Sequence, residues 1–255
     1  SILILFSIIS FFINYKIREY LIILGLSFLF SLYLFEGYLT FKKLFPKEQI
    51  LKEELYENRT NKKWDNRTKI QIYQDSKKTN NQIVVDVPPK NFFSKNFNIL
   101  PLSGISNSET IYCNENGYYA VYQSDRYGFN NPDSEWDKKE VEYLLVGDSF
   151  TLGACVNRPY DIASVLRAIS GKPALNLGYD GNGPLLEYAT LKEYLNSRVK
   201  KVIWIYYGND FYNLRFELKN EILLNYLNTP NATQNLRSKQ NEIDILVRKI
   251  IKEKE

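Results

Sequence analysis

The chain has 255 residues and a formal net charge of +4, from 33 basic and 29 acidic side chains. This length accommodates one sizeable domain with appendages, and the balanced charge argues against a surface dedicated to nucleic acid. The chain has no histidine, and its two cysteines, Cys113 and Cys155, lack metal-ligand spacing, so we expect neither a metal site nor a cofactor. The same two cysteines are compatible with a disulfide or with separate buried thiols.

Two apolar stretches lie near the N-terminus, at residues 2–13 and 20–35. A helix needs about 20 residues to cross the hydrocarbon core of a bilayer, and the second stretch reaches this length if it continues to Phe41. A signal peptide would account for only one stretch, and soluble cores seldom place Phe and Leu all round a helix. We therefore predict transmembrane segments within residues 1–41 and a membrane-anchored protein.

Basic residues near these stretches predict the orientation in the membrane. Lys16 and Arg18 lie between the two stretches, and the positive-inside rule keeps such a loop in the cytoplasm. The domain after Phe41 is then extracytoplasmic, in the periplasm or on the outer face. Lys42 and Lys43 favour the opposite orientation.

The next two segments differ in their patterns. Residues 42–69 are polar and charged, with Ile50, Leu51 and Leu55 spaced for one face of a helix, and we interpret them as a juxtamembrane linker. Residues 70–135 contain short stretches of alternating apolar and polar side chains between Gly and Asn turns, which predicts a small segment rich in β-hairpins. Its expected strands are residues 70–73, 83–87 and 118–122.

Residues 136–255 alternate strands with amphipathic helices, which predicts an α/β domain. Strands are expected to begin at Val141, Ala174 and Val202, and helices are expected at residues 159–170, 184–196, 211–227 and 242–254. This alternation implies a parallel sheet with helices on both faces. The predicted fold is a three-layer α/β/α domain with a flavodoxin-like parallel sheet. Its first helix carries one apolar face, formed by Ile162, Val165, Leu166 and Ile169.

The first of these strands leads into a Gly147-Asp148-Ser149 turn. A serine at the carboxyl end of a buried parallel strand lies at the edge where α/β folds bind their ligands, and the following helix directs backbone N–H groups toward it. Gly147 lets the backbone turn tightly beside a substrate. An ordinary strand-to-helix turn, with Asp148 or Ser149 as the helix cap, is the alternative interpretation.

Two later strands also end in polar loops. The second strand is followed by Gly178 in a glycine-rich turn, and the third by a Gly-Asn-Asp block that contains Asn209. Together with the Gly-Asp-Ser turn, and in this order, these blocks resemble the SGNH (GDSL-type) hydrolase superfamily over about residues 141 to 215. The resemblance implies that Ser149 is the nucleophile. It also implies an oxyanion hole formed by the N–H groups of Ser149 and Gly178 and by the side-chain amide of Asn209.

Residues 125–132, Asp-Arg-Tyr-Gly-Phe-Asn-Asn-Pro, resemble the lead-in of a membrane-anchored bacterial subset of this superfamily. The alternative is a turn-rich loop whose Tyr127 and Phe129 pack on the domain. Asp148 and Asp210 flank the expected site. Because a carboxylate repels an oxyanion, we interpret these two as capping or turn residues.

The Asp-x-x-His block of this superfamily, which supplies the base and its orienting carboxylate, is missing because the chain has no histidine. The chain starts at Ser1, has no methionine and stops within a charged run. We therefore interpret it as part of a longer reading frame, truncated at the C-terminus, that supplies this block beyond Glu255. A serine hydroxyl without a base is a poor nucleophile, so we expect no appreciable esterase activity from the chain alone.

The expected function is that of a serine-dependent carboxylic-ester hydrolase or O-acyltransferase, acting on an acylated small molecule, glycan or lipid at the cell envelope. A catalytically inactive binding module that keeps the oxyanion pocket is the alternative. A nucleotide-binding protein with a phosphate loop at residues 178–183 is a weaker hypothesis, because neither a G-x-G-x-x-G nor a Walker lysine pattern is present. The sequence does not predict an oligomeric state.

Overall fold

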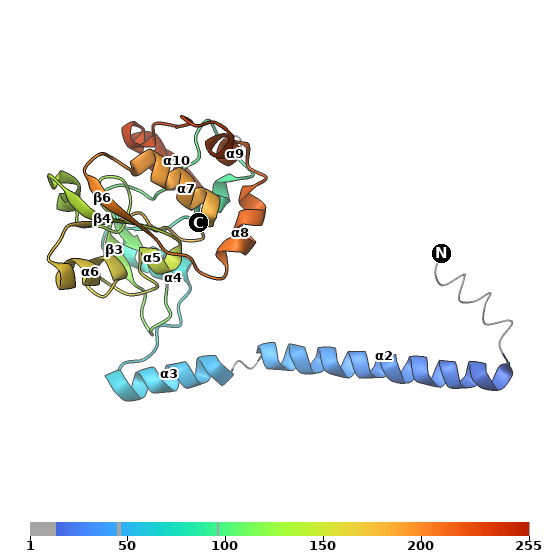
Figure 1. Ribbon diagram of the computed structural model, residues 1–255. Helices are drawn as coiled ribbons and strands as arrows, with labels where there is room; N and C mark the ends of the chain where they lie inside the picture. The colour runs from blue at the N-terminus through green and yellow to red at the C-terminus, as the bar shows by residue number, and fades with distance from the viewer. Residues whose placement is uncertain (1–13, 45–46, 96, 255) are drawn as a thin grey trace. The chain divides into compact units, whose positions relative to one another are not determined.

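The computed structural model describes residues 14–44, 47–95 and 97–254, and the chain divides into two compact units at residues 1–63 and 64–255 (Figure 1). The first unit contains α2 (Tyr15–Leu44) and α3 (Lys47–Thr60). Among the described residues, α2 alone is long and apolar enough to cross a membrane, judged by its length and composition. The predicted apolar stretch at residues 2–13 lies outside the described residues.

The helix predicted around Ile50, Leu51 and Leu55 is present as α3. All three side chains are exposed, so this apolar face is not covered by the rest of the first unit. The predicted linker is thus helical at residues 42–44 and 47–60, and residues 61–68 contain neither helix nor strand.

The second unit begins with a helix where the sequence pattern predicted a strand. Residues 70–73 belong to α4 (Lys69–Lys77), so this prediction was wrong. The Thr68 side chain accepts the N–H of Gln71, and the Gln71 side chain accepts the N–H of Thr68, which satisfies two free donors at the start of the helix. Four residues of alternation do not distinguish a strand from one helical turn, whereas this capping pair favours the helix.

A small mixed sheet follows α4. It consists of β1 (Val84–Val85), β2 (Glu109–Ile111) and β3 (Val121–Gln123), with β1 parallel and β3 antiparallel to β2. The strands predicted at residues 83–87 and 118–122 are thus present in shorter or shifted form. Two short 3₁₀ helices complete this region, η1 (Pro89–Phe92) and η2 (Asp133–Asp137).

A parallel sheet forms the centre of the second unit. Its strands are β4 (Val141–Val146), β5 (Ala174–Asn176) and β6 (Val199–Trp204), in the order β5-β4-β6. Leu144 of β4 lies opposite Leu175 of β5 and Val202 of β6. Because all three strands run in the same direction, their carboxyl ends meet at one edge of the sheet.

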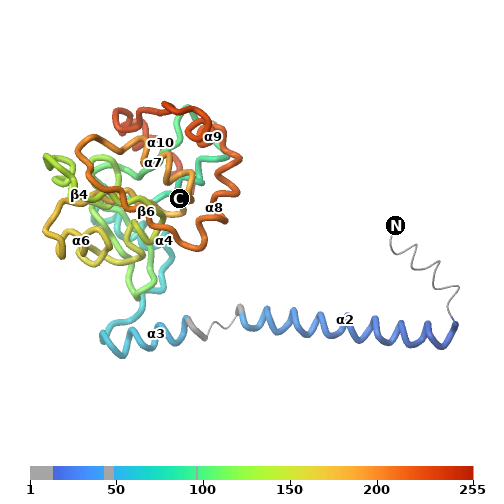
Figure 2. Tube along the Cα trace, viewed as in Figure 1, coloured from blue at the N-terminus to red at the C-terminus, as the bar shows by residue number. Residues whose placement is uncertain are grey.

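Helices lie on both sides of this sheet, and alternate residues of β4 face them. Leu144 and Val146 belong to the main core with Leu185 of α7 (Pro184–Tyr194), whereas Leu145 joins Ala163 of α6 (Ile162–Ser170) in a separate core. Figures 1 and 2 show α6 and α7 on opposite sides of the strands. The second unit is therefore a mixed α/β fold.

Four further helices complete the second unit: α5 (Ser149–Leu152), α8 (Asp210–Glu217), α9 (Glu221–Asn228) and α10 (Gln240–Lys254), with a 3₁₀ helix, η3 (Leu236–Ser238), before α10. The single helix predicted at residues 211–227 is divided, because the side chain of Asn220 accepts the N–H of Leu223 and starts a new helix there.

Candidate active site

Ser149 is the first residue of α5 and follows β4 through a turn formed by Gly147 and Asp148. Asp148 is buried, and its Oδ1 accepts the N–H of Phe150 at 2.9 Å, which caps the helix. Gly147 has no space for a side chain, because a Cβ there would lie 2.1 Å from Thr151 Oγ1. These contacts hold the half-buried Ser149 at the carboxyl edge of the sheet.

Asn209 reaches the same edge from β6. Its Nδ2 lies 3.5 Å from Asp148 Oδ2, and Ser149 Oγ lies 3.5 Å from the same oxygen. At this length both contacts are weak hydrogen bonds. The predicted nucleophile and the predicted side-chain donor therefore meet at a single atom, although they follow different strands.

Gly178 follows β5 at this edge, but its predicted role in the oxyanion hole does not agree with its geometry. The N–H of Gly178 donates to Asn176 Oδ1 at 2.8 Å. A backbone N–H has one hydrogen, so this donor is already used. A Cβ on Gly178 would lie 2.5 Å from the backbone nitrogen of Leu152, so the glycine allows close packing of the turn against α5.

Two other backbone N–H groups, those of Ser149 and Gly181, follow strands that end at this edge. Ser149 is the first residue of α5, so the helix has no preceding turn whose carbonyl could accept the Ser149 N–H. Among the residues that the structure describes, neither the N–H of Ser149 nor that of Gly181 has an acceptor. Gly181 has a φ of +69°, a left-handed conformation that favours glycine. A Cβ on Gly181 would lie 3.5 Å from Pro88 Cβ and 3.6 Å from Lys90 Nζ, so this glycine lies beside η1.

The two acidic residues beside the site have the capping and turn roles that were predicted. Asp148 caps α5, and Asp210 Oδ2 accepts the N–H of Tyr207 at 2.6 Å at the start of α8. Burial raises the pKa of Asp210 above its ordinary value, and the nearby charge of Asp148 adds to this shift. Both carboxylates therefore support the turns that carry Ser149 and Asn209.

The lead-in segment at residues 125–132 is mostly buried and contacts the turn after β4 and the end of β5. Asp125 accepts hydrogen bonds from two backbone N–H groups and two side chains, one of them Trp136 Nε1 at 2.7 Å. Burial raises the pKa of Asp125 to about 6, and these donors oppose the shift. Asn130 Nδ2 donates to the Leu152 carbonyl, and Asn131 bonds the backbone of Asn176 in both directions. This segment thus fixes the turns after Ser149 and before Gly178.

A buried tyrosine that the sequence interpretation did not include lies against the candidate nucleophile. Burial raises the pKa of the Tyr112 phenol well above its usual range, so it stays protonated, and hydrogen bonding to Ser149 opposes this shift. A disulfide between Cys113 and Cys155 connects the residue after Tyr112 to the loop after α5. The sequence was compatible with this disulfide or with separate thiols. Had the disulfide been predicted, it would have placed Tyr112 near the loop that follows Ser149.

Exposed aromatic rings border the candidate site. The rings of Phe150 and Tyr207 lie 4.4 Å apart, and both side chains are exposed. Phe150 follows Ser149, and Tyr207 precedes Asn209 by two residues. The pair therefore provides an apolar surface beside the serine.

The arrangement provides a serine hydroxyl, the Asn209 amide and the backbone N–H of Ser149 at one sheet edge. A hydroxyl of this kind can attack a carbonyl carbon, and the two donors can stabilise the oxyanion that forms. Among the described residues, no group of three or more His, Cys, Asp or Glu side chains is arranged to hold a metal ion. Comparisons of the chain with protein-family models, curated proteins and solved structures find no match.

Proposed function

We propose that the chain carries the SGNH-like site of a membrane-anchored serine ester hydrolase or O-acyltransferase, acting on an acylated glycan, lipid or small molecule at the cell envelope. The observation that carries this proposal is the meeting of Ser149 Oγ and Asn209 Nδ2 at one oxygen, each at 3.5 Å. The strand order β5-β4-β6 supports a flavodoxin-like three-layer fold, because it matches the 2-1-3 start of that sheet.

In this reaction Ser149 Oγ attacks the ester carbonyl carbon, and the carbonyl electron pair moves onto oxygen to give an oxyanion. The N–H of Ser149 and the amide of Asn209 stabilise that charge, and removal of one such donor costs about 100- to 1000-fold in rate. Collapse of the intermediate expels the alcohol and leaves an acyl group on Ser149. Water then releases the acid in a hydrolase, or an acceptor hydroxyl takes the acyl group in a transferase. The rings of Phe150 and Tyr207 provide the apolar surface for the acyl group.

The step that lacks a residue is proton removal from Ser149. The chain has no histidine. Two buried carboxyl groups have pKa values near neutrality because of burial, Asp86 at about 7 and Glu187 at about 8. In the described part of the chain neither hydrogen bonds to Ser149. Loss of the base costs a serine hydrolase around a millionfold in turnover, so the chain alone should be nearly inactive.

Free imidazole tests this proposal, because it is a diffusible substitute for the missing base. We expect the full chain in detergent to hydrolyse p-nitrophenyl acetate only when imidazole is added, at a rate above the imidazole background given by Ser149→Ala. Asn209→Ala should lower that rate by about 100-fold. Identical rates for the unmodified chain and Ser149→Ala at every imidazole concentration would refute the catalytic role of Ser149.

A catalytically inactive binding module is the second candidate. The Asp148 carboxylate favours it, because Asp148 Oδ2 lies 3.5 Å from both Ser149 Oγ and Asn209 Nδ2, and its charge would repel an oxyanion held by these groups. For this candidate we expect no imidazole-dependent turnover, together with binding of an acylated sugar that Asn209→Ala weakens.

We also propose that α2 anchors the protein and that the second unit lies outside the cytoplasm. The charges of Lys16 and Arg18 at the start of α2 support this orientation, and the Cys113–Cys155 disulfide is typical of an oxidising compartment. An alkaline phosphatase reporter fused after Lys63 should then be active. Activity of a cytoplasmic reporter alone at this position would reverse the orientation.

A further inference from the structure

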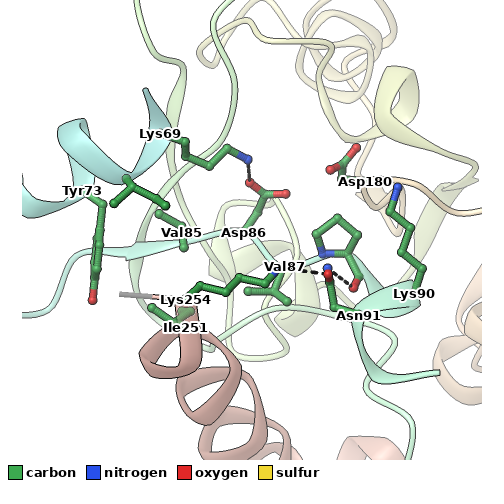
Figure 3. A pocket seen from close by; sticks show the side chains of 12 residues that line it. Lys69, Tyr73, Val85, Asp86, Val87, Lys90, Asn91, Asp180, Ile251 and Lys254 are labelled. Carbon is green, nitrogen blue, oxygen red and sulfur yellow. Dashed lines mark hydrogen bonds and ion pairs between the residues drawn. The ribbon is translucent and has the colours of Figure 1, made fainter. Parts of the chain in front are cut away.

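A pocket with a volume of about 310 Å³ lies in the second unit between α4, β1, η1 and the C-terminal end of α10 (Figure 3). Its charged lining consists of three lysines and two aspartates, Lys69, Lys90, Lys254, Asp86 and Asp180. The remaining wall consists mainly of apolar side chains from α4, α10 and residues 85–88, together with the polar Asn91 of η1. This volume is at the lower end of the range for small-molecule sites, so it fits about one sugar unit.

Asp86 is the one carboxylate in this pocket whose side chain is fully buried. Its Oδ1 accepts from Lys69 Nζ at 2.5 Å, whereas its Oδ2 has no donor among the described residues. Burial raises the pKa of Asp86 to about 7, and the neighbouring carboxylate of Asp180 adds to this shift (Figure 3). A buried polar atom without a partner is destabilising, so Asp86 Oδ2 is suited to a hydrogen bond with a hydroxyl group of a ligand.

The charge of the pocket favours an anion. Lys69 pairs with Asp86, so the three lysines exceed the charged aspartates by one when Asp86 is ionised and by two when it is protonated. Among the described residues Lys90 makes no ion pair, and Lys254 Nζ donates to Asn91 Oδ1 at 2.9 Å. Both ammonium groups are on exposed side chains at the pocket, so an incoming anion can reach them.

The pocket is close to the candidate nucleophile. Tyr112, whose side chain interacts with Ser149, also lies within electrostatic reach of Asp86 and Asp180. Lys69 Nζ lies 5.8 Å from the centre of the Tyr112 ring. The Tyr112 ring therefore lies beside Lys69 of the pocket, and Ser149 is among the groups that influence the pKa of its phenol.

We propose that this pocket binds an acidic sugar. Its hydroxyl groups donate to Asp86 Oδ2 and to Asp180, and its single carboxylate or phosphate group pairs with Lys90 and Lys254. The assignment of this sugar as the glycan part of the substrate of Ser149 rests on the proposed function, whereas the binding itself does not. Glucuronate and glucose 6-phosphate present this chemistry with a carboxylate and a phosphate respectively.

Isothermal titration calorimetry on the full chain in detergent tests the site. We expect glucuronate or glucose 6-phosphate to bind at least 10-fold more tightly than glucose or inorganic phosphate, and the tighter of the two identifies the anionic group. Asp86→Asn should weaken binding about 10- to 100-fold, because it replaces the free acceptor with a donor amide. Lys90→Met should also weaken it, while Lys200→Met, a matched exposed lysine on β6, should not.

Equal affinity of all four compounds, or unchanged binding by Lys90→Met and Asp86→Asn, would overturn the proposal. Lys90 is exposed, so its variant reports on binding even if Asp86→Asn fails to fold. Ser149→Ala separates this site from the proposed function, because it should abolish imidazole-dependent turnover and leave sugar binding unchanged. Sugar binding without any turnover would support the sugar-binding pocket and refute the esterase proposal. Turnover without sugar binding would support the esterase proposal and refute the sugar-binding pocket.

Discussion

Removal of the disulfide should destabilise the second unit and loosen the candidate site together. Cys113 and Cys155 are 42 residues apart in the sequence, and a cross-link that closes a loop of this length lowers the entropy of the unfolded chain by an amount worth about 4 kcal/mol. For a unit of this size the loss corresponds to a decrease in melting temperature of about 10 °C. Because Cys113 follows Tyr112, the same change frees Tyr112 from the loop after Ser149.

The assay is thermal unfolding of the full chain in detergent, followed by tryptophan fluorescence. The three tryptophans, Trp64, Trp136 and Trp204, all lie in the second unit, so the signal reports on that unit alone. The double variant Cys113→Ser, Cys155→Ser should melt at the same temperature as the unmodified chain in reductant. A decrease below about 2 °C, or no effect of reductant, would refute the assignment of a stabilising cross-link.

Three further substitutions should change stability in ways that urea unfolding can measure. Burial raises the pKa of Glu187 to about 8 from an ordinary 4.5. The folded protein therefore holds this proton more tightly than the unfolded chain, and the resulting stabilisation is complete below pH 4.5. It is lost as the pH rises through 8, which lowers the free energy of unfolding by up to about 5 kcal/mol. Glu187→Gln keeps an acceptor for Trp204 Nε1 and should be the more stable form at pH 8 but not at pH 4; an equal pH dependence of both proteins would contradict this. Gly147→Ala should cost about 1–3 kcal/mol, because its Cβ would lie 2.1 Å from Thr151 Oγ1, and unchanged stability would show that the turn can relax. Asn131→Ala removes three buried hydrogen bonds and should cost about 3 kcal/mol, and a loss below 1 kcal/mol would show that the segment before β4 does not hold the site.

The parallel sheet was predictable because β4 is buried on both faces. Such a strand is a nearly continuous apolar run, which residues 141–146 form, and the glycine turn after it marks where it ends. The apolar face of α6 was less informative. Ile162, Val165 and Ile169 are exposed, while Ala163 and Ser164 are the buried residues of that helix. An apolar stripe identifies one side of a helix, but the packing of the sheet determines which side is covered.

The site was predictable to the extent that it depends on strand ends. Ser149 and Asn209 follow neighbouring parallel strands, so their convergence at one edge could be expected from the chain order. The direction of the Gly178 N–H could not be predicted from the sequence, because it depends on the position of the Asn176 side chain in the folded turn. Tyr112 directly follows β2 of the other sheet, and its place near Ser149 depends on the tertiary structure.

The charged pocket could not be predicted from the sequence, because it also depends on the tertiary structure. Lys69, Asp86, Asp180 and Lys254 come from four separate segments, and each alone reads as an ordinary surface charge. Their proximity and the burial of Asp86 exist only in the folded second unit.

The measurement that tests the central claim most directly is covalent labelling of the full chain by a fluorophosphonate in the presence of imidazole, with the modified residue identified by mass spectrometry. Reaction of a serine with this reagent requires the activated nucleophile and the oxyanion donors of an ester hydrolase. We predict one adduct, on Ser149, formed about 100-fold more slowly in Asn209→Ala. An adduct on a different serine, or an unmodified Ser149 at every imidazole concentration, would contradict the assignment of Ser149 as the nucleophile.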